Sequence, residues 1–450
     1  MFVQVTSRLT SRLTSRATTH SPTLLRFSGG LLSFILLAAC SQQQAEPAAP
    51  EAAQQSVTQP APQPAAAPPA AVTVYEGGRL IVGDGSAVIE NATFVVEGGR
   101  FTAVGATGAV AVPAAAVHVD LAGATVMPTL IDTHVHLSRE REPLINDLTQ
   151  RAKFGVSAAM SLGQDEGEVV YQVRNENAAG IALYRTAGRG ITAPEPGRTE
   201  IPHWITTVDE ARAAVQAEAA LNVDIIKIWV DDRNGQFAKL TPELYGAVID
   251  EAHRNNLRVV AHLFTLEDAK GLVRAGVDAF AHGVRDMDVD DEFMALVAAN
   301  PAFVLGPNLP ARGVATDLAW LTGAIPAEQL QQLQAAATGQ PEVIAAYGIQ
   351  SRNLARMSSA GVTIVLGTDG NTPWGPHIEM EDMVAAGMTP AAVITAATSN
   401  GAAYMRLDDR GSISTGKRAD FIVLDANPLE DITNSRRIHR VYLAGEAVQR

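Results

Sequence analysis

The chain has 450 residues, of which 47% are hydrophobic, and a formal net charge of −14 at pH 7. This length exceeds one ordinary small domain and suits a barrel of roughly 250 residues with accessory segments around a large core. The acidic balance argues against nucleic acid as a partner and against broad electrostatic adhesion to anionic lipid.

Residues 1–39 have the pattern of an export signal. They contain four arginines and no acidic residue, and residues 27–39 are uncharged. This apolar stretch is well short of the roughly 20 residues that a membrane span requires. Removal of the signal would change the formal charge from −14 to −18, because four positive charges and no negative charge leave with it. A Thr-Ser-Arg repeat near the start leaves the true translation start open.

The signal ends in Leu37-Ala38-Ala39-Cys40, which resembles a bacterial lipobox. The resemblance implies that Cys40 is lipidated and becomes the mature N-terminus, on the periplasmic side of a bacterial membrane. Ser41 after the cysteine favours the outer membrane. Cys40 is the single cysteine of the chain, so a metal site in the folded part has to use nitrogen and oxygen ligands.

Residues 40–71 are predicted to form an extended tether. From residue 41 they hold seven prolines with many alanines and glutamines, and no aromatic residue. Such a composition buries too little apolar surface to offset the entropy of ordering, and the prolines keep it extended. We expect the lipid alone to connect the folded part to the membrane.

Short β-rich runs separated by glycine-containing turn signals occupy residues 72–126. The predicted strands cover residues 72–75, 79–82, 92–97, 100–104 and 117–121, with a turn expected at 76–78. Residues 409–450 repeat this style, with strands expected at 419–425 and 440–445. Because the two segments flank a long middle region, we expect them to build one small β-sandwich from both ends of the chain.

Residues 127–408 alternate strand and helix patterns. The predicted strands cover residues 129–136, 156–161, 181–186, 224–230, 258–263, 279–282, 303–309 and 363–368. Amphipathic helices are expected at 207–221, 242–255, 266–275, 291–299, 341–360 and 390–407. This alternation predicts an α/β fold, a (β/α)8 TIM barrel accompanied by the β-sandwich of the N- and C-terminal segments.

A two-histidine motif ends the first predicted barrel strand. Side chains alternate faces along a strand, so His134 and His136 point the same way, with Val135 turned into the opposite layer. Two imidazoles in this arrangement can clamp a metal ion. The alternative is a pair of buried core histidines that are merely hydrogen-bonded.

Further metal-competent residues end later strands. Lys227 belongs to the fourth strand, His262 ends the fifth, His282 ends the sixth and Asp369 follows the eighth. Each has a structural explanation by itself, as a snorkelling lysine, a core histidine or a helix cap. In such barrels, however, the chemistry sits at the C-terminal ends of the strands. These four residues and the two histidines of the first strand are six metal-competent residues at one rim, and together they predict a metal site.

These motifs resemble the amidohydrolase superfamily, specifically its imidazolonepropionase-like and prolidase-like branch. The resemblance runs from about residue 72 to residue 450, through 128–137, the Lys227 strand, Ala261-His262, Ala281-His282-Gly283, Gly367-Thr368-Asp369 and the closing 411–413 and 416–420. It implies two divalent metal ions. His134 and His136 would hold one ion and His262 and His282 the other, with a carboxylated Lys227 as bridge and Asp369 as ligand and proton shuttle.

Elementary charge considerations agree with that assignment. A protonated lysine would be repelled by two divalent ions, whereas a carbamate on Lys227 supplies anionic oxygens that can bridge. Metal binding lowers the pKa of water from 15.7 towards about 7, so a bridging hydroxide is available at neutral pH. The expected function is attack of that hydroxide on an amide bond, with Asp369 passing the proton to the leaving amine. Zinc is the expected metal, and manganese or cobalt could serve.

Substrate-binding candidates lie just past the strand ends. Arg189, Arg233 and Arg285 could hold a substrate carboxylate, and His377 follows the eighth strand. The alternative for each is a solvated or structural role. Members of the branch commonly carry a histidine in a glycine-rich segment after the third strand, but here residues 188–197 lack one, so no substrate role is transferred through that loop.

Other functions remain open on the same scaffold. A cyclic-amide hydrolase or deaminase and a lactonase or esterase are enzymatic alternatives, and a lipid-anchored binding protein on an inactive barrel is a third class. Lys227 argues against a mononuclear deaminase, which typically lacks a bridging lysine. Because an exported enzyme meets peptides, we expect a dipeptide or N-acyl amino acid as substrate. The exact substrate and the oligomeric state, including a homo-oligomer, are left open.

Overall fold

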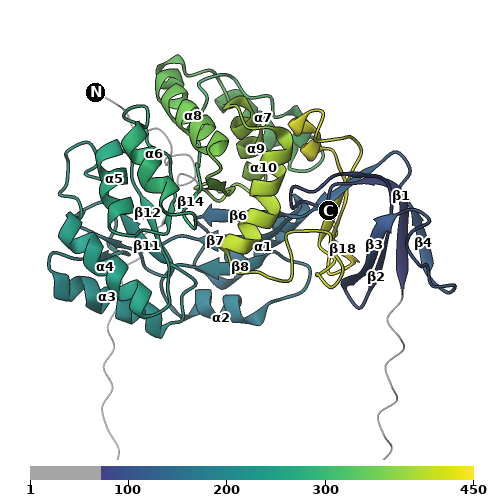
Figure 1. Ribbon diagram of the computed structural model, residues 1–450, viewed down its shortest axis with the longest axis horizontal. Helices are drawn as coiled ribbons and strands as arrows, with labels where there is room; N and C mark the ends of the chain where they lie inside the picture. Colours follow the sequence, from purple (N-terminus) through teal and green to yellow (C-terminus); the bar gives the residue numbers. More distant parts are fainter. Residues whose placement is uncertain (1–71) are drawn as a thin grey trace, which may run out of the picture. The chain divides into compact units, whose positions relative to one another are not determined.

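The computed structural model describes residues 72–450 (Figure 1). The export signal, Cys40 and the tether, which the sequence places before residue 72, lie outside the described residues, as do the predictions attached to them. Within residues 72–450, none of the helices combines the length and the apolar character that crossing a bilayer requires.

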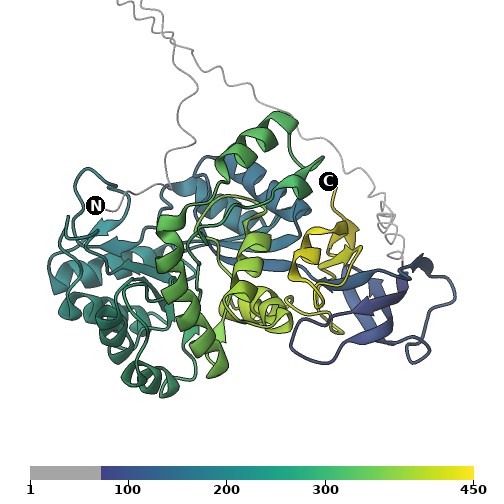
Figure 2. The ribbon, with the colours of Figure 1, turned by 90° about the horizontal axis from the view of Figure 1, so that it is seen from above.

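Segments from both ends of the described chain form one eight-stranded sheet. The strands are β1 (Thr73–Leu80), β2 (Ile89–Glu97), β3 (Arg100–Ala106), β4 (Val117–Asp120), β5 (Thr125–Pro128), β16 (Phe421–Leu424), β17 (Ile438–Leu443) and β18 (Glu446–Ala447). Their order is β18-β17-β16-β5-β1-β2-β3, with β4 paired to β1. Antiparallel pairing of β5 with β16 joins the two segments, and Figure 2 shows them side by side from above. The two terminal segments therefore pair as predicted, but they form a single hydrogen-bonded sheet, and a two-layer sandwich is not confirmed within residues 72–450.

The turn expected at residues 76–78 is wrong. The two predicted runs on either side of it form the single strand β1, whose pairing with β2 shifts register between Glu76 and Gly78. Gly77 has a φ of +87°, which lets the backbone take up the irregularity inside the strand rather than end it.

An aromatic cluster forms the core of this sheet. Tyr75 and Phe94 stack with ring centroids 4.9 Å apart, and Phe421 and Tyr442 stack at 4.4 Å. Tyr75 also meets Phe421 edge to face at 5.1 Å. Because these rings come from both ends of the described chain, neither segment has this core without the other.

The middle of the chain forms an α/β fold of the TIM-barrel type. Its parallel strands are β6 (Leu130–Val135), β7 (Val156–Ser161), β8 (Leu183–Thr186), β9 (Ile191–Thr192), β10 (His203–Trp204), β11 (Ile226–Trp229), β12 (Val259–His262), β13 (Ala279–Phe280), β14 (Val304–Leu305) and β15 (Thr363–Ile364). All eight predicted strands appear among them. The two-residue strands β9 and β10 were not predicted, because two residues carry no periodicity.

The strands belong to two sheets rather than to one closed ladder. One sheet has the order β6-β7-β8 and the other β10-β9-β11-β12-β13-β14-β15. Hydrogen bonds cross both seams. Thr133 N donates to the Leu366 carbonyl at 2.9 Å, and Asp224 N donates to the Thr186 carbonyl at 2.9 Å. The first of these seams brings the end of β6 to the segment after β15.

Eleven α-helices occur within residues 72–450. They are α1 (Arg141–Lys153), α2 (Glu168–Glu176), α3 (Val208–Ala220), α4 (Pro242–Arg254), α5 (Leu266–Arg274), α6 (Asp291–Ala298), α7 (Ala327–Ala336), α8 (Ile344–Ser359), α9 (Gly375–Ala385), α10 (Pro390–Thr395) and α11 (Gly401–Tyr404). Helices α3 to α6 each follow a Thr or Asp whose side chain accepts a hydrogen bond from the first turn. The helix predicted at 390–407 is divided by a π-helical segment, Ala396–Asn400.

Candidate metal centre

Strand β6 and the segment after β15 bring three candidate ligands together. The rings of His134 and His136 lie 5.2 Å apart, as the strand alternation predicts. Oδ1 of Asp369 lies 3.2 Å from Nε2 of His134 and 3.0 Å from Nε2 of His136. Ligand atoms of the three residues all fall within 4.8 Å of one another, a grouping that could hold a metal ion.

The other predicted ligands lie at the same rim. His282 has its ring 5.4 Å from that of His134, and its Nε2 lies 3.7 Å from Oδ2 of Asp369. The His262 ring is 4.6 Å from the His282 ring. Lys227 on β11 pairs with β12 two residues before His262, and its side chain is buried. The strand ends selected from the sequence therefore converge.

Several buried donor atoms at this rim have no hydrogen-bond partner within residues 72–450. They are Nε2 of His282, Nζ of Lys227 and Nε2 of His134, the last of which makes no aligned hydrogen bond although Oδ1 of Asp369 lies 3.2 Å away. Buried polar atoms are nearly always paired in proteins, so this set calls for an occupant. Burial, followed by the influence of Lys227, lowers the pKa of His134 to about 4. Burial also holds the pKa of His282 well below its usual value. Both imidazoles are thus neutral at pH 7, the form that binds a divalent ion.

Lys227 is held in a tight apolar setting. Burial lowers its pKa to about 7, Asp369 opposes that shift and Arg233 adds to it. A Cβ on Gly163 would lie 2.5 Å from the Trp229 ring and 2.8 Å from Cγ of Lys227, and one on Gly190 would lie 2.1 Å from the same ring. The two glycines therefore leave room for Trp229 and, beside it, for the lysine stem.

Two of the three candidate arginines adjoin the histidines, and their surroundings differ. Arg233 Nη1 lies 3.1 Å from Nε2 of His262, but its guanidinium also binds Glu195 at 2.9 Å and Asp231. Two carboxylates therefore neutralise Arg233. His262 itself contacts Oδ2 of Asp231 at 3.0 Å.

Arg285 lies beside His282 without an acidic partner. Its Nε donates to Gln350 at 2.8 Å, its Nη2 lies 3.3 Å from Nδ1 of His282, and its guanidinium stacks 4.0 Å from the centre of the Phe264 ring. Within residues 72–450 it forms no ion pair. Burial lowers its pKa to about 10, so it stays charged at pH 7. Arg285 is a partly buried cation available to an anionic group.

The structure does not bring Arg189 or His377 to this centre. Arg189 Nε donates to the Ile201 carbonyl at 2.5 Å. His377 lies in α9, where its ring nitrogens contact Ser435 Oγ at 3.0 Å and the Phe154 carbonyl at 2.9 Å. Burial lowers the pKa of His377 to about 4. Both ring nitrogens are engaged, which is the structural role that the sequence left open as the alternative.

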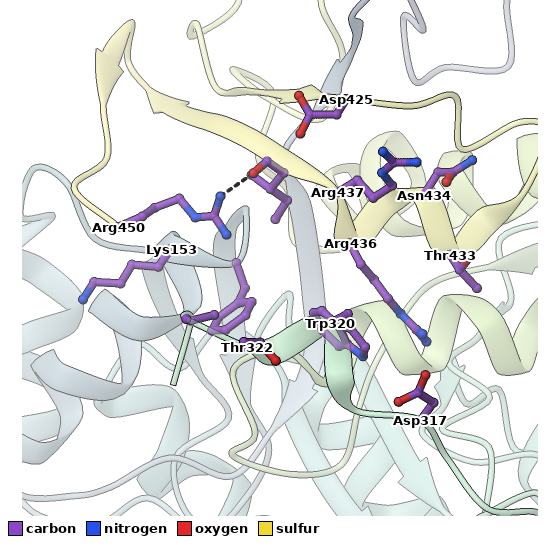
Figure 3. Close-up of a pocket in the computed structure, with 14 residues that line it drawn as sticks. Lys153, Asp317, Trp320, Thr322, Asp425, Thr433, Asn434, Arg436, Arg437 and Arg450 are labelled. Atoms are coloured by element: carbon purple, nitrogen blue, oxygen red, sulfur yellow. Dashed lines mark hydrogen bonds between the residues drawn. The ribbon is translucent and has the colours of Figure 1, made fainter. Parts of the chain in front are cut away.

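Figure 3 shows a cavity of about 840 Å³ whose lining includes none of the six predicted ligands. Arg436 extends alongside Trp320, with its guanidinium 5.0 Å from the ring centre. This arginine also pairs with Glu381. The ring of His377 lies 5.9 Å from that of Trp320, but His377 is not among the lining residues. The cavity is therefore distinct from the candidate metal centre.

Three residues that the sequence did not single out support the centre. Asp132 and Arg151 form an ion pair beneath the Asp369 loop, and Asn308 Nδ2 lies 2.7 Å from Nδ1 of His134. Asp132 was visible as a lone acid inside the apolar run that leads to the histidines. Neither Arg151 nor Asn308 has a signal in the local sequence, because their partners are distant along the chain.

Comparison with known proteins gives one family match and three similar proteins. Residues 231–448 match the profile of the Amidohydrolase family. Imidazolonepropionase of Deinococcus radiodurans is 27% identical over 384 residues, covering 80% of this chain and 92% of that protein. Ochratoxinase of Aspergillus niger is 28% identical over 313 residues, covering 62% of this chain and 60% of that protein. The crystal structure of a putative prolidase from Bifidobacterium longum is 29% identical, covers 85% of this chain and 96% of that chain, and has a TM-score of 0.70.

Proposed function

We propose that the chain hydrolyses carbon–nitrogen bonds and cleaves the amide of a dipeptide or N-acyl amino acid with two divalent metal ions, zinc by default. The match of residues 231–448 to the Amidohydrolase family supports the hydrolase class. The observation that carries the proposal is the grouping of ligand atoms of His134, His136 and Asp369 within 4.8 Å of one another. Nε2 of His282 and Nζ of Lys227 add buried nitrogen atoms without a hydrogen-bond partner within residues 72–450. The residues proposed to hold the ions are His134, His136, Lys227, His262, His282 and Asp369.

When bound, the ions would supply an acidified water and polarise the substrate carbonyl. The protein's own contribution to proton transfer is assigned to Asp369. Its side chain is 41% exposed, unlike the buried His134 and His282, so it faces the open side of the rim where a substrate would lie. A carboxylate there can take the proton of the attacking water and pass it to the leaving amine.

Carboxylation of Lys227 is part of the proposal. Burial lowers the pKa of this amine to about 7, so a large fraction is neutral at pH 7 to 8. A neutral amine can add to carbon dioxide and lose a proton, which leaves a carbamate. The unmodified amine offers a single donor atom, whereas a carbamate offers two anionic oxygens that can reach both ions.

Arg285 is proposed to bind the free carboxylate of the substrate. It is preferred over Arg233, whose charge Asp231 and Glu195 already neutralise. A partly buried arginine without an acidic partner can form charge-assisted, bidentate hydrogen bonds with a substrate carboxylate. The small-molecule and dipeptide substrates of the relatives are compatible with this assignment.

We expect Arg285→Met to remove the preference for a free carboxylate. Wild-type kcat/KM should fall when the substrate carboxylate is amidated, by about 10- to 100-fold for a lost charge-assisted hydrogen bond. In Arg285→Met the free and amidated substrates should react alike, and this ratio cancels any general damage to the centre. Arg189→Met is the control and should keep the wild-type ratio. An unchanged ratio in Arg285→Met would contradict the assignment.

The match that spans 92% of an imidazolonepropionase favours a second candidate, hydrolysis of a cyclic amide. A substrate panel of dipeptides, N-acyl amino acids, cyclic amides, lactones and esters separates the two and tests the ester alternative. Turnover of linear amides supports the proposal. Turnover of cyclic amides, or of lactones and esters alone, would replace it.

We also infer that the protein is exported and held at the periplasmic side of a bacterial outer membrane by lipid on Cys40. The inference rests on Leu37-Ala38-Ala39-Cys40 and the proline-rich residues after it. Mass spectrometry of the mature N-terminus should find a diacylglyceryl cysteine at residue 40. A free thiol at Cys40 in membrane-extracted protein would refute the anchor.

A further inference from the structure

We propose that Asp132 and Arg151 are positioning residues that hold the Asp369 loop against the β6 histidines. The inference rests on the proposed function and assigns a role to two residues outside its ligand set. Asp132 lies in β6 and Arg151 in α1, both side chains are fully buried, and Nη1 of Arg151 lies 3.2 Å from Oδ2 of Asp132.

The Asp132 carboxylate joins the two backbone segments that carry the candidate ligands. Its Oδ1 accepts hydrogen bonds from Thr368 N at 3.1 Å and from His134 N at 3.4 Å. Its Oδ2 accepts one from Thr368 Oγ1 at 2.8 Å. One side chain therefore ties the histidine strand to the residue that precedes Asp369.

Arg151 holds the other side of the loop. Its Nη2 donates to the Gly370 carbonyl at 3.0 Å, and that carbonyl also accepts from His136 N at 3.3 Å. Asp369 lies between Thr368 and Gly370, the two residues held in this way, and has a φ of +52°. For a residue other than glycine this left-handed conformation has an energetic cost, so it persists only where surrounding contacts stabilise it. The contacts of Asp132 and Arg151 stabilise this conformation together with the direct hydrogen bond from Asp369 N to the His134 carbonyl at 2.8 Å.

The arrangement argues for positioning rather than for bulk stability. A buried ion pair is often no more stabilising than apolar side chains of similar volume, because both charges lose their hydration. Here the contacts of the pair go to the backbone that flanks Asp369 and His134. The pair thereby keeps Oδ1 of Asp369 within 3.2 Å of both imidazoles.

The test compares isosteric and disruptive variants of the full chain. Asp132→Asn and Arg151→Met should each weaken metal binding by about 10- to 100-fold, the range found when a residue that orients a ligand is lost. Affinity is measured on the metal-free protein by competition with a chromophoric chelator. For the enzyme loaded with metal we expect kcat to fall and the KM for substrate to change little. The reason is that Asp132 and Arg151 orient Asp369 and do not touch the substrate.

Arg174→Met is the matched control, because it breaks the Arg174–Asp224 pair of 2.8 Å in the same α/β part. It should change the melting temperature without changing metal affinity. The positioning role of Asp132 and Arg151 would be overturned by an equal loss of metal affinity in Arg174→Met. Wild-type metal affinity and kcat in Asp132→Asn would overturn it as well. If Asp132→Asn fails to fold, metal affinity is measured on Thr368→Val instead. This variant removes only the hydrogen bond from Thr368 Oγ1 to Asp132, and wild-type metal affinity and kcat in it would overturn the proposal. A wild-type chain that binds no metal would refute the proposed function itself, a separate outcome.

Discussion

Replacing Lys227 with alanine should lower kcat/KM by about 10³-fold, equivalent to about 4 kcal/mol of transition-state stabilisation, and should reduce the metal content of the chain. The carboxylated lysine would be the one side chain that contacts both ions, so its loss would affect both. A short carboxylic acid such as acetate should restore part of the activity, because the deleted side chain leaves space beside Trp229 that a carboxylate can enter. Metal content by mass spectrometry and kcat/KM with and without acetate measure this.

Lys270→Ala is the control for the loss of a lysine. Lys270 on α5 pairs with Asp290 at 2.5 Å and with Glu292 at 2.7 Å, and it takes no part in the metal centre. We expect its metal content and kcat/KM to match the wild type. Full activity in Lys227→Ala would eliminate the bridging role.

Asp369→Asn should lower kcat by about 10²- to 10⁴-fold, the range for loss of a general acid–base group. The amide keeps the size of the side chain but cannot take the proton of the attacking water. If Asp369 delivers that proton to the leaving amine, substrates with an activated leaving group, such as nitroanilides, should lose much less. Steady-state kinetics on paired nitroanilide and alkylamide substrates measure the difference.

Asp286→Asn is the corresponding control, because Asp286 caps α5 through Leu266 N at 3.0 Å. Its kcat should equal that of the wild type. An equal loss on both substrates in Asp369→Asn, at wild-type metal content, would assign Asp369 to metal binding alone and remove its role as shuttle.

The grouping of His134, His136 and Asp369 was predictable from the sequence for a geometric reason. Parallel strands in this fold class present their C-terminal ends at one rim, so residues at strand ends meet although they are far apart in the chain. The spacing of His134 and His136 fixed their common face, and their rings lie 5.2 Å apart. The ranking of the arginines was not predictable, because Glu195 neutralises Arg233 from a loop 38 residues away.

Helices α1 and α9 were not predicted, and the two omissions share a physical cause. Helix α1 buries Arg151 beside Leu144 and Leu148, and α9 buries His377 and Glu379, so polar residues interrupt the apolar stripe that would reveal each helix. Burial of those groups is possible because distant partners satisfy them, such as Asp132 for Arg151. Local periodicity contains no information about such partners.

The central claim is most directly tested by a metal titration of the chelated full chain with a dipeptide substrate. We predict that chelation abolishes amide hydrolysis and that activity returns with added zinc until two ions are bound per chain. Hydrolysis that persists without metal, or that is fully restored by one ion per chain, would contradict the binuclear mechanism.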